Sequence, residues 1–335
     1  MERRMFINAV HREECRIAIV EDGNLIELEV ESNVGKKLKG NIYRAEIARI
    51  EPSLQAAFLD IGTERNGFLQ INDIHPAYFR STNNNGRRPR IQDVLHAGQK
   101  LVVQVVKEER EMKGATLTTY LSLPGRYVVI MPGSDRGGIS RKINDSEQRR
   151  RLKALASELE MPQGMGMIIR TAGLDRSQAE LSRDLSLQLK LWEGILERAQ
   201  TADCPSLLYR ESELATRVIR DYFTPEIREI LIDDQQTYQK VKDFVAKVMP
   251  RYRSRVKEYT HEQPIFSYHG IDEQVGDTFL NEVKLPSGGA IVIDSLEALV
   301  AIDVNSGKAT AGGDIEETAY KTNLEAVDEI ARQLR

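Results

Sequence analysis

The chain has 335 residues and a formal net charge of −4, with 41% hydrophobic and 29% charged residues. This composition indicates a globular chain of roughly two to four domains and argues against intrinsic disorder. The weakly negative charge argues against a protein that coats nucleic acid through global attraction, but it leaves room for local basic patches. No apolar run approaches the roughly 20 residues that span a bilayer, so we expect no transmembrane segment.

The two cysteines, Cys15 and Cys204, are too few for a disulfide framework and fit a reducing cytoplasm. The N-terminus becomes polar by His11 and lacks a small-residue cleavage site, so it does not have the pattern of a signal peptide. Each local basic cluster, taken alone, is better explained as a solvated face than as a binding site. These clusters are residues 87–90, Arg136 with Arg141 and Lys142, residues 149–151, and Arg251, Arg253, Arg255 and Lys257.

The first predicted element is a β-hairpin, with strands at 16–20 and 25–30 around a turn at 21–24. Residues 37–125 then carry short strands that are separated by turn signals and have no long helices between them. Regular short strands of this kind predict a small β-barrel, with a flexible loop at the low-complexity residues 81–86. The barrel strands are expected at 41–50, 56–61, 67–69 and 101–106.

Residues 126–215 mix strands, expected at 127–131 and 167–170, with two amphipathic helices. Asp145 and Gln148 resemble a capping box that opens the first helix. The apolar face of this helix comprises Leu152, Leu155, Ala156 and Leu159. The second helix runs from Ser177 to about Gln200, and its apolar stripe, which we expect in the core, is Leu181, Leu185, Leu189, Trp192 and Leu196.

The last third of the chain begins with a helix, a strand at 229–232 and another helix, which predicts an α/β piece over 216–280. A hairpin with strands at 289–294 and 298–303 follows, and a final helix begins near Asp314. The chain stops at Arg335 without Gly, Pro or a cap, so we expect a chain that has been shortened within a domain.

Asp303 and Asn305 are the first candidates for chemistry. Asp303 is predicted to end a strand, and side chains two residues apart on a strand face the same way. Their oxygens are hard ligands suited to Mg²⁺, which usually takes one or two protein carboxylates together with phosphate and water. Asp294 and Glu297 are nearby in sequence as partners or as ordinary hairpin polar groups. Taken alone, Asp303 and Asn305 are better explained by a turn that ends the strand.

Two further groups have residue types that bind RNA. Phe58 and Phe68 on barrel strands, with Lys113 farther along, could stack bases and hold phosphate, although a single aromatic more often fills the barrel. Arg170 at a strand end can hold phosphate in a bidentate fork, and the hydroxyl of Thr171 can add a hydrogen bond. From these residues alone, a surface turn is the simpler explanation of the Arg170 segment.

Together, these segments resemble the ribonuclease E/G family, and its ribonuclease E branch more than its ribonuclease G branch. They occur in order across essentially all 335 residues, so the likeness is specific although no single motif is. The residues that carry it are 40–43, 50–58, 113–119, 137–141, 169–173, 285–289, 301–306 and 312–318.

The resemblance implies an α+β / α/β multidomain fold. It implies an RNase H-like domain at 1–36 and 216–280, an inserted S1-type OB fold at 37–126, a 5′-sensor domain at 127–215, and a DNase I-like nuclease domain from 281. It also implies a role for each candidate residue. Asp303 matches a catalytic aspartate that binds Mg²⁺, and Asn305 matches the asparagine that supports the reacting centre. The pocket for a 5′-monophosphate would comprise Arg170, Thr171, Gly125 and Val129, and the RNA-gripping face Phe58, Phe68 and Lys113.

The implied function is a Mg²⁺-dependent, single-strand-specific endoribonuclease of rRNA processing and mRNA decay that a 5′-monophosphate stimulates. The family further implies a homotetramer in the cytoplasm, held near the inner membrane by a tail. Its second magnesium aspartate would follow a segment matching residues 332–335. That aspartate, the cysteine pair that shares Zn²⁺ and the tetramerising domain are absent from this sequence. An RNA-binding fragment without catalysis is therefore the alternative, and a scaffold for protein partners is a third.

Overall fold

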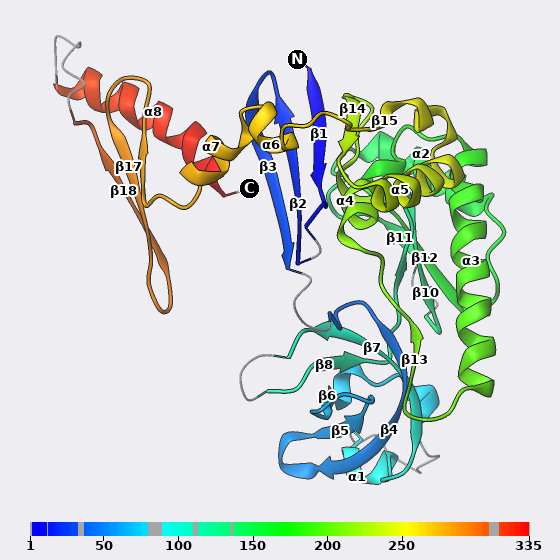
Figure 1. Ribbon diagram of the computed structural model, residues 1–335. Helices are drawn as coiled ribbons and strands as arrows, with labels where there is room; N and C mark the ends of the chain where they lie inside the picture. Colours follow the sequence, from blue (N-terminus) through cyan, green and yellow to red (C-terminus); the bar gives the residue numbers. More distant parts are fainter. Residues whose placement is uncertain are drawn as a thin grey trace. The chain divides into compact units, whose positions relative to one another are not determined.

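The computed structural model describes residues 2–11, 13–32, 37–79, 89–109, 113–134, 137–307 and 315–334. The chain divides into two compact units, which we call the terminal unit (Met1–Val34 and Leu214–Arg335) and the inserted unit (Gly35–Glu213) (Figure 1). Several sequence features lie outside the described residues, namely the predicted loop at 81–86, Arg87, Arg88, Arg136 and the family segment at 312–314.

A five-stranded sheet in the order β15-β14-β1-β2-β3 forms the centre of the terminal unit. Its strands are β1 (Arg3–Asn8), β2 (Glu14–Glu21), β3 (Asn24–Ser32), β14 (Ile227–Ile232) and β15 (Val256–Glu258). β1 pairs in parallel with β14 and antiparallel with β2, so the two chain segments of this unit meet at the middle of the sheet. The hairpin therefore does not have to be stable alone, which an isolated pair of strands rarely is.

The predicted N-terminal hairpin is confirmed, and the backbone of its turn explains why the sequence pattern predicts it. Asp22 and Gly23 both have positive φ, 48° and 88°. A two-residue turn of this kind needs left-handed backbone at both positions, which Asp-Gly provides with little strain.

Helices cover the sheet, as predicted for an α/β piece. They are α4 (Leu214–Tyr222), α5 (Gln235–Val248), α6 (Ile265–Tyr268) and α7 (Ile271–Asp277), with the 3-10 helix η5 (Pro250–Arg255). The Asp234 side chain caps α5 by accepting a hydrogen bond from the Thr237 amide at 2.7 Å. The core against α6 and α7 contains Phe6, Ala18 and Phe266.

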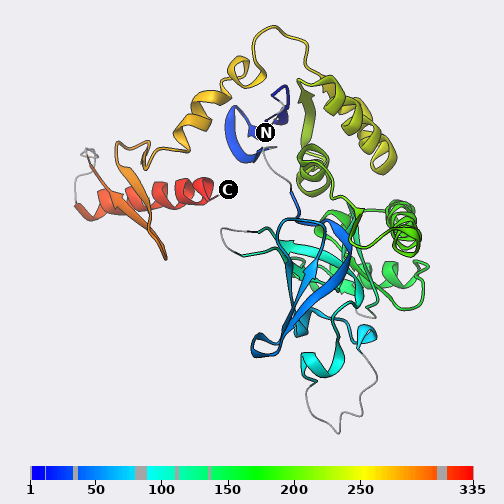
Figure 2. The same cartoon turned by 60° about the horizontal axis from the view of Figure 1, so that its bottom comes forward.

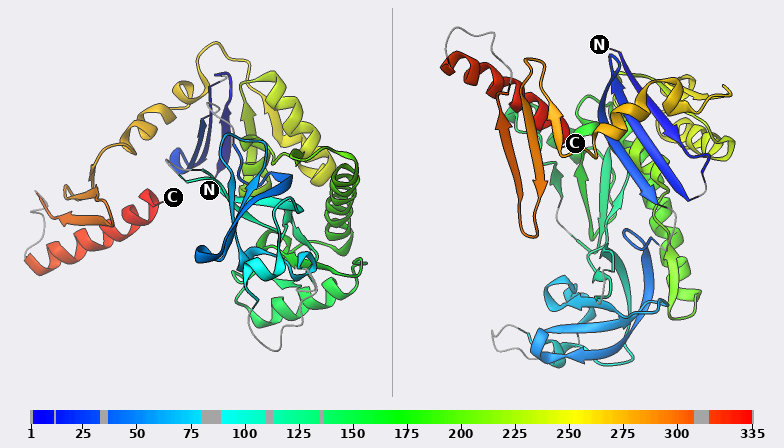
Figure 3. Two further views of the ribbon diagram at one scale, coloured as in Figure 1. Left: turned by 90° about the horizontal axis from the view of Figure 1, so that it is seen from below. Right: turned by 60° about the vertical axis from the view of Figure 1, so that its left-hand side comes forward.

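The last part of the terminal unit is a three-stranded antiparallel sheet of β16 (Glu282–Lys284), β17 (Ala290–Ser295) and β18 (Val300–Asn305), covered by α8 (Ile315–Gln333) (Figure 3). Ile291 and Ala326 are buried between this sheet and the helix. The predicted hairpin is confirmed, but the expected end of its second strand at Asp303 is wrong. β18 continues to Asn305 because Ala290 still pairs with that residue.

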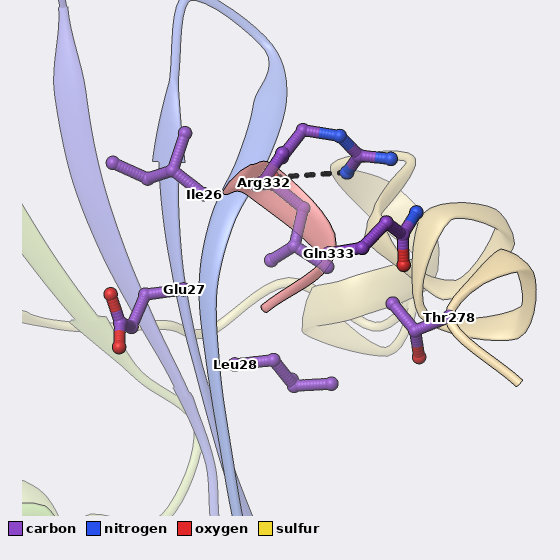
Figure 4. Close-up of a pocket in the computed structure, with 7 residues that line it drawn as sticks. Ile26, Glu27, Leu28, Thr278, Arg332 and Gln333 are labelled. Carbon is purple, nitrogen blue, oxygen red and sulfur yellow. Dashed lines mark hydrogen bonds between the residues drawn. The ribbon is translucent and has the colours of Figure 1, made fainter. Parts of the chain in front are cut away.

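A small pocket of the terminal unit lies beside the end of α8 and is lined by Leu25, Ile26, Glu27, Leu28, Thr278, Arg332 and Gln333 (Figure 4). Arg332 donates to the Leu25 carbonyl at 3.4 Å and to Glu329 Oε1 at 2.6 Å. This pocket contains none of the candidate residues. In the described part of the chain, no helix is long and apolar enough to cross a membrane.

The inserted unit contains the predicted barrel, whose sheet order is β13-β4-β5-β6-β8-β7 (Figure 2). β4 also pairs with β7, and this pairing closes the barrel. The elements are β4 (Ile42–Glu51), β5 (Ala56–Asp60), β6 (Gly67–Gln70), β7 (Lys100–Lys107), β8 (Thr116–Thr118), β13 (Ser206–Tyr209), α1 (Ile91–Val94), η1 (Pro52–Leu54), η2 (Ile71–Asp73) and η3 (Pro76–Tyr78). Alternate residues such as Ile47, Leu59 and Leu69 fill its interior.

A second sheet of the inserted unit has the order β11-β12-β10-β9. Its elements are β9 (Leu123–Pro124), β10 (Val128–Pro132), β11 (Gly138–Ile139), β12 (Met165–Ile169), η4 (Thr171–Gly173), α2 (Ser146–Ser157) and α3 (Gln178–Thr201). α2 begins after its predicted capping residue Asp145, and α3 begins after Ser177, where its apolar stripe was expected to start. Asp145 accepts from the Gln148 amide at 2.7 Å, and Ser177 forms a full capping box with Glu180.

The apolar stripe predicted on α3 is only partly correct. Leu181 and Leu185 are buried, but Trp192 is half-buried instead of in the core, and Leu196 is 40% exposed. The residue that is buried near this end is Ile195. On an ideal helix Leu196 lies only about 20° around the axis from the buried Leu185, so helix periodicity alone does not predict its exposure.

Candidate nucleic-acid interface and carboxylate site

The predicted RNA-gripping phenylalanines lie on the outside of the barrel. In β5, Ala57 and Leu59 are buried in the barrel core, and Phe58 between them points the other way and is half-buried. Phe58 pairs in register with Phe68, and their ring centroids are 5.7 Å apart in an edge-to-face arrangement. Two aromatic faces are thus presented side by side instead of filling the barrel.

Arg49 joins this pair, and the sequence did not single it out. It lies opposite Phe58 on β4, and its guanidinium carbon is 4.9 Å from the Phe58 ring centroid. Simple alternation would place Arg49 on the same face as the buried Ile47. A bulge between these two residues turns Arg49 outward instead, where it is exposed. The arginine adds a positive charge over the aromatic pair.

Lys113 lies three residues before β8, the strand that pairs with Phe68. The Phe68 amide donates to the Ala115 carbonyl at 2.7 Å, two residues beyond Lys113. Gly114 lies so close to Asn66 that a Cβ atom would come within 2.1 Å of the Asn66 carbonyl oxygen. The tight crossing fixes the path of the chain, and the Lys113 side chain is exposed beside it.

The residues predicted to read a 5′-phosphate gather around the turn between β9 and β10. Arg170 follows β12 and donates from Nη1 to the Gly125 carbonyl at 2.7 Å, while its own amide donates to the Tyr127 carbonyl at 2.8 Å. Thr171 comes next and is exposed. Val129 is half-buried on β10, one residue after Val128, which pairs with Ile169. The structure therefore brings Arg170 and Gly125 into contact and places Thr171 and Val129 beside them.

Asp184 on α3 lies behind this turn and was missed by sequence reasoning. It is 1% exposed and accepts hydrogen bonds from the amides of Arg126, Tyr127 and Val128 at 3.1, 2.7 and 3.0 Å. Burial raises the pKa of Asp184, and the three amide hydrogen bonds oppose that rise. The only sequence signal was an acidic residue on the apolar side of a helix.

Two arginines flank the ring of Tyr127 in the same region. The guanidinium carbons of Arg126 and Arg176 lie 5.6 and 5.7 Å from the ring centroid. Arg176 also pairs with Glu180 at 3.6 Å. Burial raises the pKa of Tyr127, although the two nearby arginines lower it in part. Arg126, Arg170 and Arg176 therefore gather around this turn, where the carboxylates of Asp184 and Glu180 offset part of their charge.

Asp303 and Asn305 lie together on one face of the terminal hairpin, as predicted. Both are exposed on β18, whereas Ile302 and Val304 between and beside them pack toward α8. Asp294 of β17 pairs with Ala301 and so belongs to the same face, where it accepts a hydrogen bond from Asn281 at 3.2 Å.

The donor set on this face fits a magnesium ion that keeps most of its own water. Across the described ranges, no three His, Cys, Asp or Glu side chains gather closely enough to hold a metal ion. Mg²⁺ often uses only one or two protein carboxylates, however, with water and phosphate oxygens completing its shell. Exposed carboxylate and amide oxygens on one strand face, as in Asp303 and Asn305, match that requirement.

Comparison with known proteins supports the predicted family. A family model described as "Ribonuclease E/G family" matches residues 122–335. A second model, described as "S1 RNA binding domain", matches residues 36–119, which include the barrel. The S1-type nature of the inserted barrel is therefore confirmed.

Curated relatives agree with both models. Ribonuclease E of Escherichia coli (strain K12) is 50% identical over 99% of this chain and 32% of its own length. Ribonuclease E of Haemophilus influenzae is 49% identical over 99% of this chain and 36% of its own length. Ribonuclease G of Escherichia coli (strain K12) is 36% identical over 100% of this chain and 69% of its own length. The chain spans about a third of the two ribonuclease E relatives and belongs to the ribonuclease E/G family.

Proposed function

We propose that this chain is the RNA-binding and catalytic part of a Mg²⁺-dependent, single-strand-specific endoribonuclease that acts in RNA processing and mRNA decay. The observation that carries the proposal is the outward-facing pair of Phe58 and Phe68 on a barrel that matches the S1 RNA-binding model, within a chain of a ribonuclease family. A module that stacks bases is what a nuclease for unpaired RNA needs.

The barrel face would hold the strand that is to be cut. Every base has a flat face, so stacking on Phe58 and Phe68 would select unpaired RNA without selecting its sequence. Arg49, over the Phe58 ring, and the exposed Lys113 would attract the phosphate backbone. Double-stranded RNA hides its bases from such a platform, which explains a preference for single strands.

The turn at Gly125 would bind the 5′ end. Arg170 has a planar guanidinium whose donors match a phosphate monoester, and the Thr171 hydroxyl beside it can donate one more hydrogen bond. Gly125 and Val129 would line the pocket through backbone and packing. A 5′-monophosphate held here is a second contact on the same RNA, so it raises the effective concentration of the strand at the cutting site.

The hairpin would supply the catalytic carboxylate. Asp303 would hold Mg²⁺, and the amide of Asn305 would orient either the scissile phosphate or the Asp303 carboxylate. When bound, the ion supplies positive charge to the phosphate and lowers the pKa of a coordinated water. Asp303 is already exposed on a strand face, so little protein rearrangement is needed for it to meet RNA.

The finer domain assignments belong to the same proposal. We assign an RNase H-like domain to 1–36 and 216–280, an OB fold to 37–126, a 5′-sensor domain to 127–215 and a DNase I-like domain from 281. The mixed sheet with β1 parallel to β14 supports the first assignment, and the closed barrel supports the second. Assembly into homotetramers and a cytoplasmic location near the inner membrane rest on the family alone.

A cleavage assay tests the proposal. The chain would be incubated with an unstructured RNA carrying a 5′-monophosphate or a 5′-hydroxyl, in Mg²⁺ with and without EDTA. We expect internal cuts that EDTA abolishes and that are faster on the monophosphorylated RNA. A stable complex that is never cut would favour the RNA-binding alternative, and no affinity for RNA at low salt would favour a scaffold.

A further inference from the structure

The buried carboxylate of Asp184 and the guanidinium of Arg170 are connected through a single peptide group. The amide of Arg126 donates to Asp184 at 3.1 Å, and the carbonyl of Gly125 accepts from Arg170 at 2.7 Å. These two groups belong to the same planar peptide unit, in which the N–H and the C=O point in opposite directions. Whatever orients the N–H therefore orients the carbonyl that Arg170 contacts.

Asp184 orients that peptide strongly because its hydrogen bonds are several and sheltered. Three consecutive amides, of Arg126, Tyr127 and Val128, converge on one carboxylate that is 1% exposed. Hydrogen bonds to an ionised acceptor are about twice as strong as neutral ones. An aspartate is rarely buried this completely, and this one is compensated by the turn that it shapes.

Gly125 makes the close approach possible. A Cβ atom at this position would lie 2.5 Å from Asp184 Oδ2, which no real side chain tolerates. Because residue 125 is a glycine, the carboxylate can lie directly behind the turn. In this conformation of the turn, the Gly125 carbonyl faces Arg170. The turn at Gly125 is therefore packed tightly between the Asp184 carboxylate and the Arg170 guanidinium.

We propose that Asp184 is a positioning residue for recognition of the RNA 5′ end. By fixing the peptide between Gly125 and Arg126, it holds the Arg170 guanidinium where it can bind a terminal phosphate, and it does so without touching RNA. The inference rests on the proposed role of Arg170 as the ligand of the 5′-phosphate. It names Asp184 as a determinant of the preference for 5′-monophosphorylated over 5′-hydroxyl RNA.

The test compares Asp184→Asn with the wild-type chain. The substitution keeps the size of the side chain, but it replaces one acceptor oxygen with an NH₂ group that cannot accept from the amides. Values of kcat/KM would be measured on one unstructured RNA with either 5′ end. We expect the monophosphate preference to fall roughly tenfold, as for loss of one charge-assisted hydrogen bond, with cleavage of the 5′-hydroxyl RNA unchanged.

Three companion variants separate the possible failures. Glu193→Gln, at an exposed position of the same helix, should leave both rates unchanged. Arg170→Ala should remove the preference, and adding Asp184→Asn to it should then have no further effect on the ratio. If Arg170→Ala keeps the preference, the proposed sensor itself fails. If Arg170→Ala lowers the ratio and Asp184→Asn does not, only the present inference fails.

An equal loss on both RNAs in Asp184→Asn would show a purely structural role and overturn the inference. Thermal unfolding would show whether the variant folds. If it does not, Asp184→Glu decides the question, because it keeps the carboxylate but adds a methylene that must displace the turn at Gly125. A lower ratio in that variant supports the inference, and a ratio equal to that of the wild type overturns it.

Discussion

The turn between β9 and β10 and the strand β18 both present groups proposed to handle phosphate, but the chain holds them in different ways. At the turn, Arg170 contacts the Gly125 carbonyl, and the turn itself is fixed by the buried Asp184. On β18, Asp303 and Asn305 stand exposed on an open strand face. One region is shaped in advance by its own contacts, and the other offers ligands to whatever approaches.

The difference follows from what each region would bind. A terminal phosphate is recognised by several donors in fixed directions, so its pocket benefits from groups that are already oriented. A hydrated cation with a phosphate needs only a few oxygens and completes its shell with water. Binding at the turn should therefore depend most on the residues that hold it rigid. Binding on the hairpin should depend most on the presence of one carboxylate.

The largest effect is expected at Asp303. Asp303→Asn removes the charge that would hold Mg²⁺ without changing the shape of the side chain, so cleavage should fall on the order of 10³-fold. RNA affinity, measured by fluorescence anisotropy, should stay the same because the barrel face is untouched. The matched control is Asp294→Asn, on the same face of the hairpin, which should change cleavage only severalfold. Cleavage at the wild-type rate in Asp303→Asn would refute the metal role.

The next effect is steric and belongs to the turn. Gly125→Ala places a Cβ atom against Asp184 and must displace the turn, so the preference for 5′-monophosphorylated RNA should fall roughly tenfold or more. Stability should fall by about 1–3 kcal/mol in urea unfolding, as for other overpacked sites. Gly138→Ala is the control, because a Cβ atom there meets nothing within 4 Å. If the two variants had the same 5′-monophosphate preference and the same stability, the turn would not be shaped in advance.

The barrel face should lie between the turn and β18 in how firmly it is held, because Phe58 and Phe68 are half-buried and pack against each other. Phe58→Ala removes one stacking surface and leaves Arg49 without its ring, so affinity for unstructured RNA should fall about tenfold. The control is Leu54→Ala, an exposed apolar residue of the same barrel. An affinity loss of the same size in both variants would point to general surface effects instead of stacking.

The smallest effect concerns pH, at a carboxylate of α8, the helix that covers the sheet containing β18. A hydrogen bond from the Ser287 amide, at 2.9 Å, lowers the pKa of Glu325 on α8, whereas burial raises the pKa of Asp184. A lowered pKa means that Glu325 contributes stability above its unfolded pKa and loses it as the pH falls through the folded value. Glu325→Gln should therefore slightly reduce the melting temperature at pH 7 but not at pH 3. Glu317→Gln, exposed on the same helix, should leave the melting temperature unchanged at both pH values. A lower melting temperature of Glu325→Gln at pH 3 alone would contradict the predicted direction.

Much of the fold could be predicted from local patterns. Asp22 and Gly23 fixed the first hairpin because only residues that accept left-handed backbone suit that turn. Asp145 marked the start of the first helix of the inserted unit through its cap. The spacing of Asp303 and Asn305 placed them on one strand face. Each of these depends only on residues close together in the sequence.

Other features depended on contacts between distant parts of the chain. The bulge in β4 turned Arg49 outward, and pairing with Ala290 extended β18 to Asn305. Packing of α3 chose Ile195 over Leu196 for the core and aimed Asp184 at amides that lie 56 to 58 residues earlier in the chain. Local periodicity says which residues share a face, but only tertiary packing decides which neighbours that face meets.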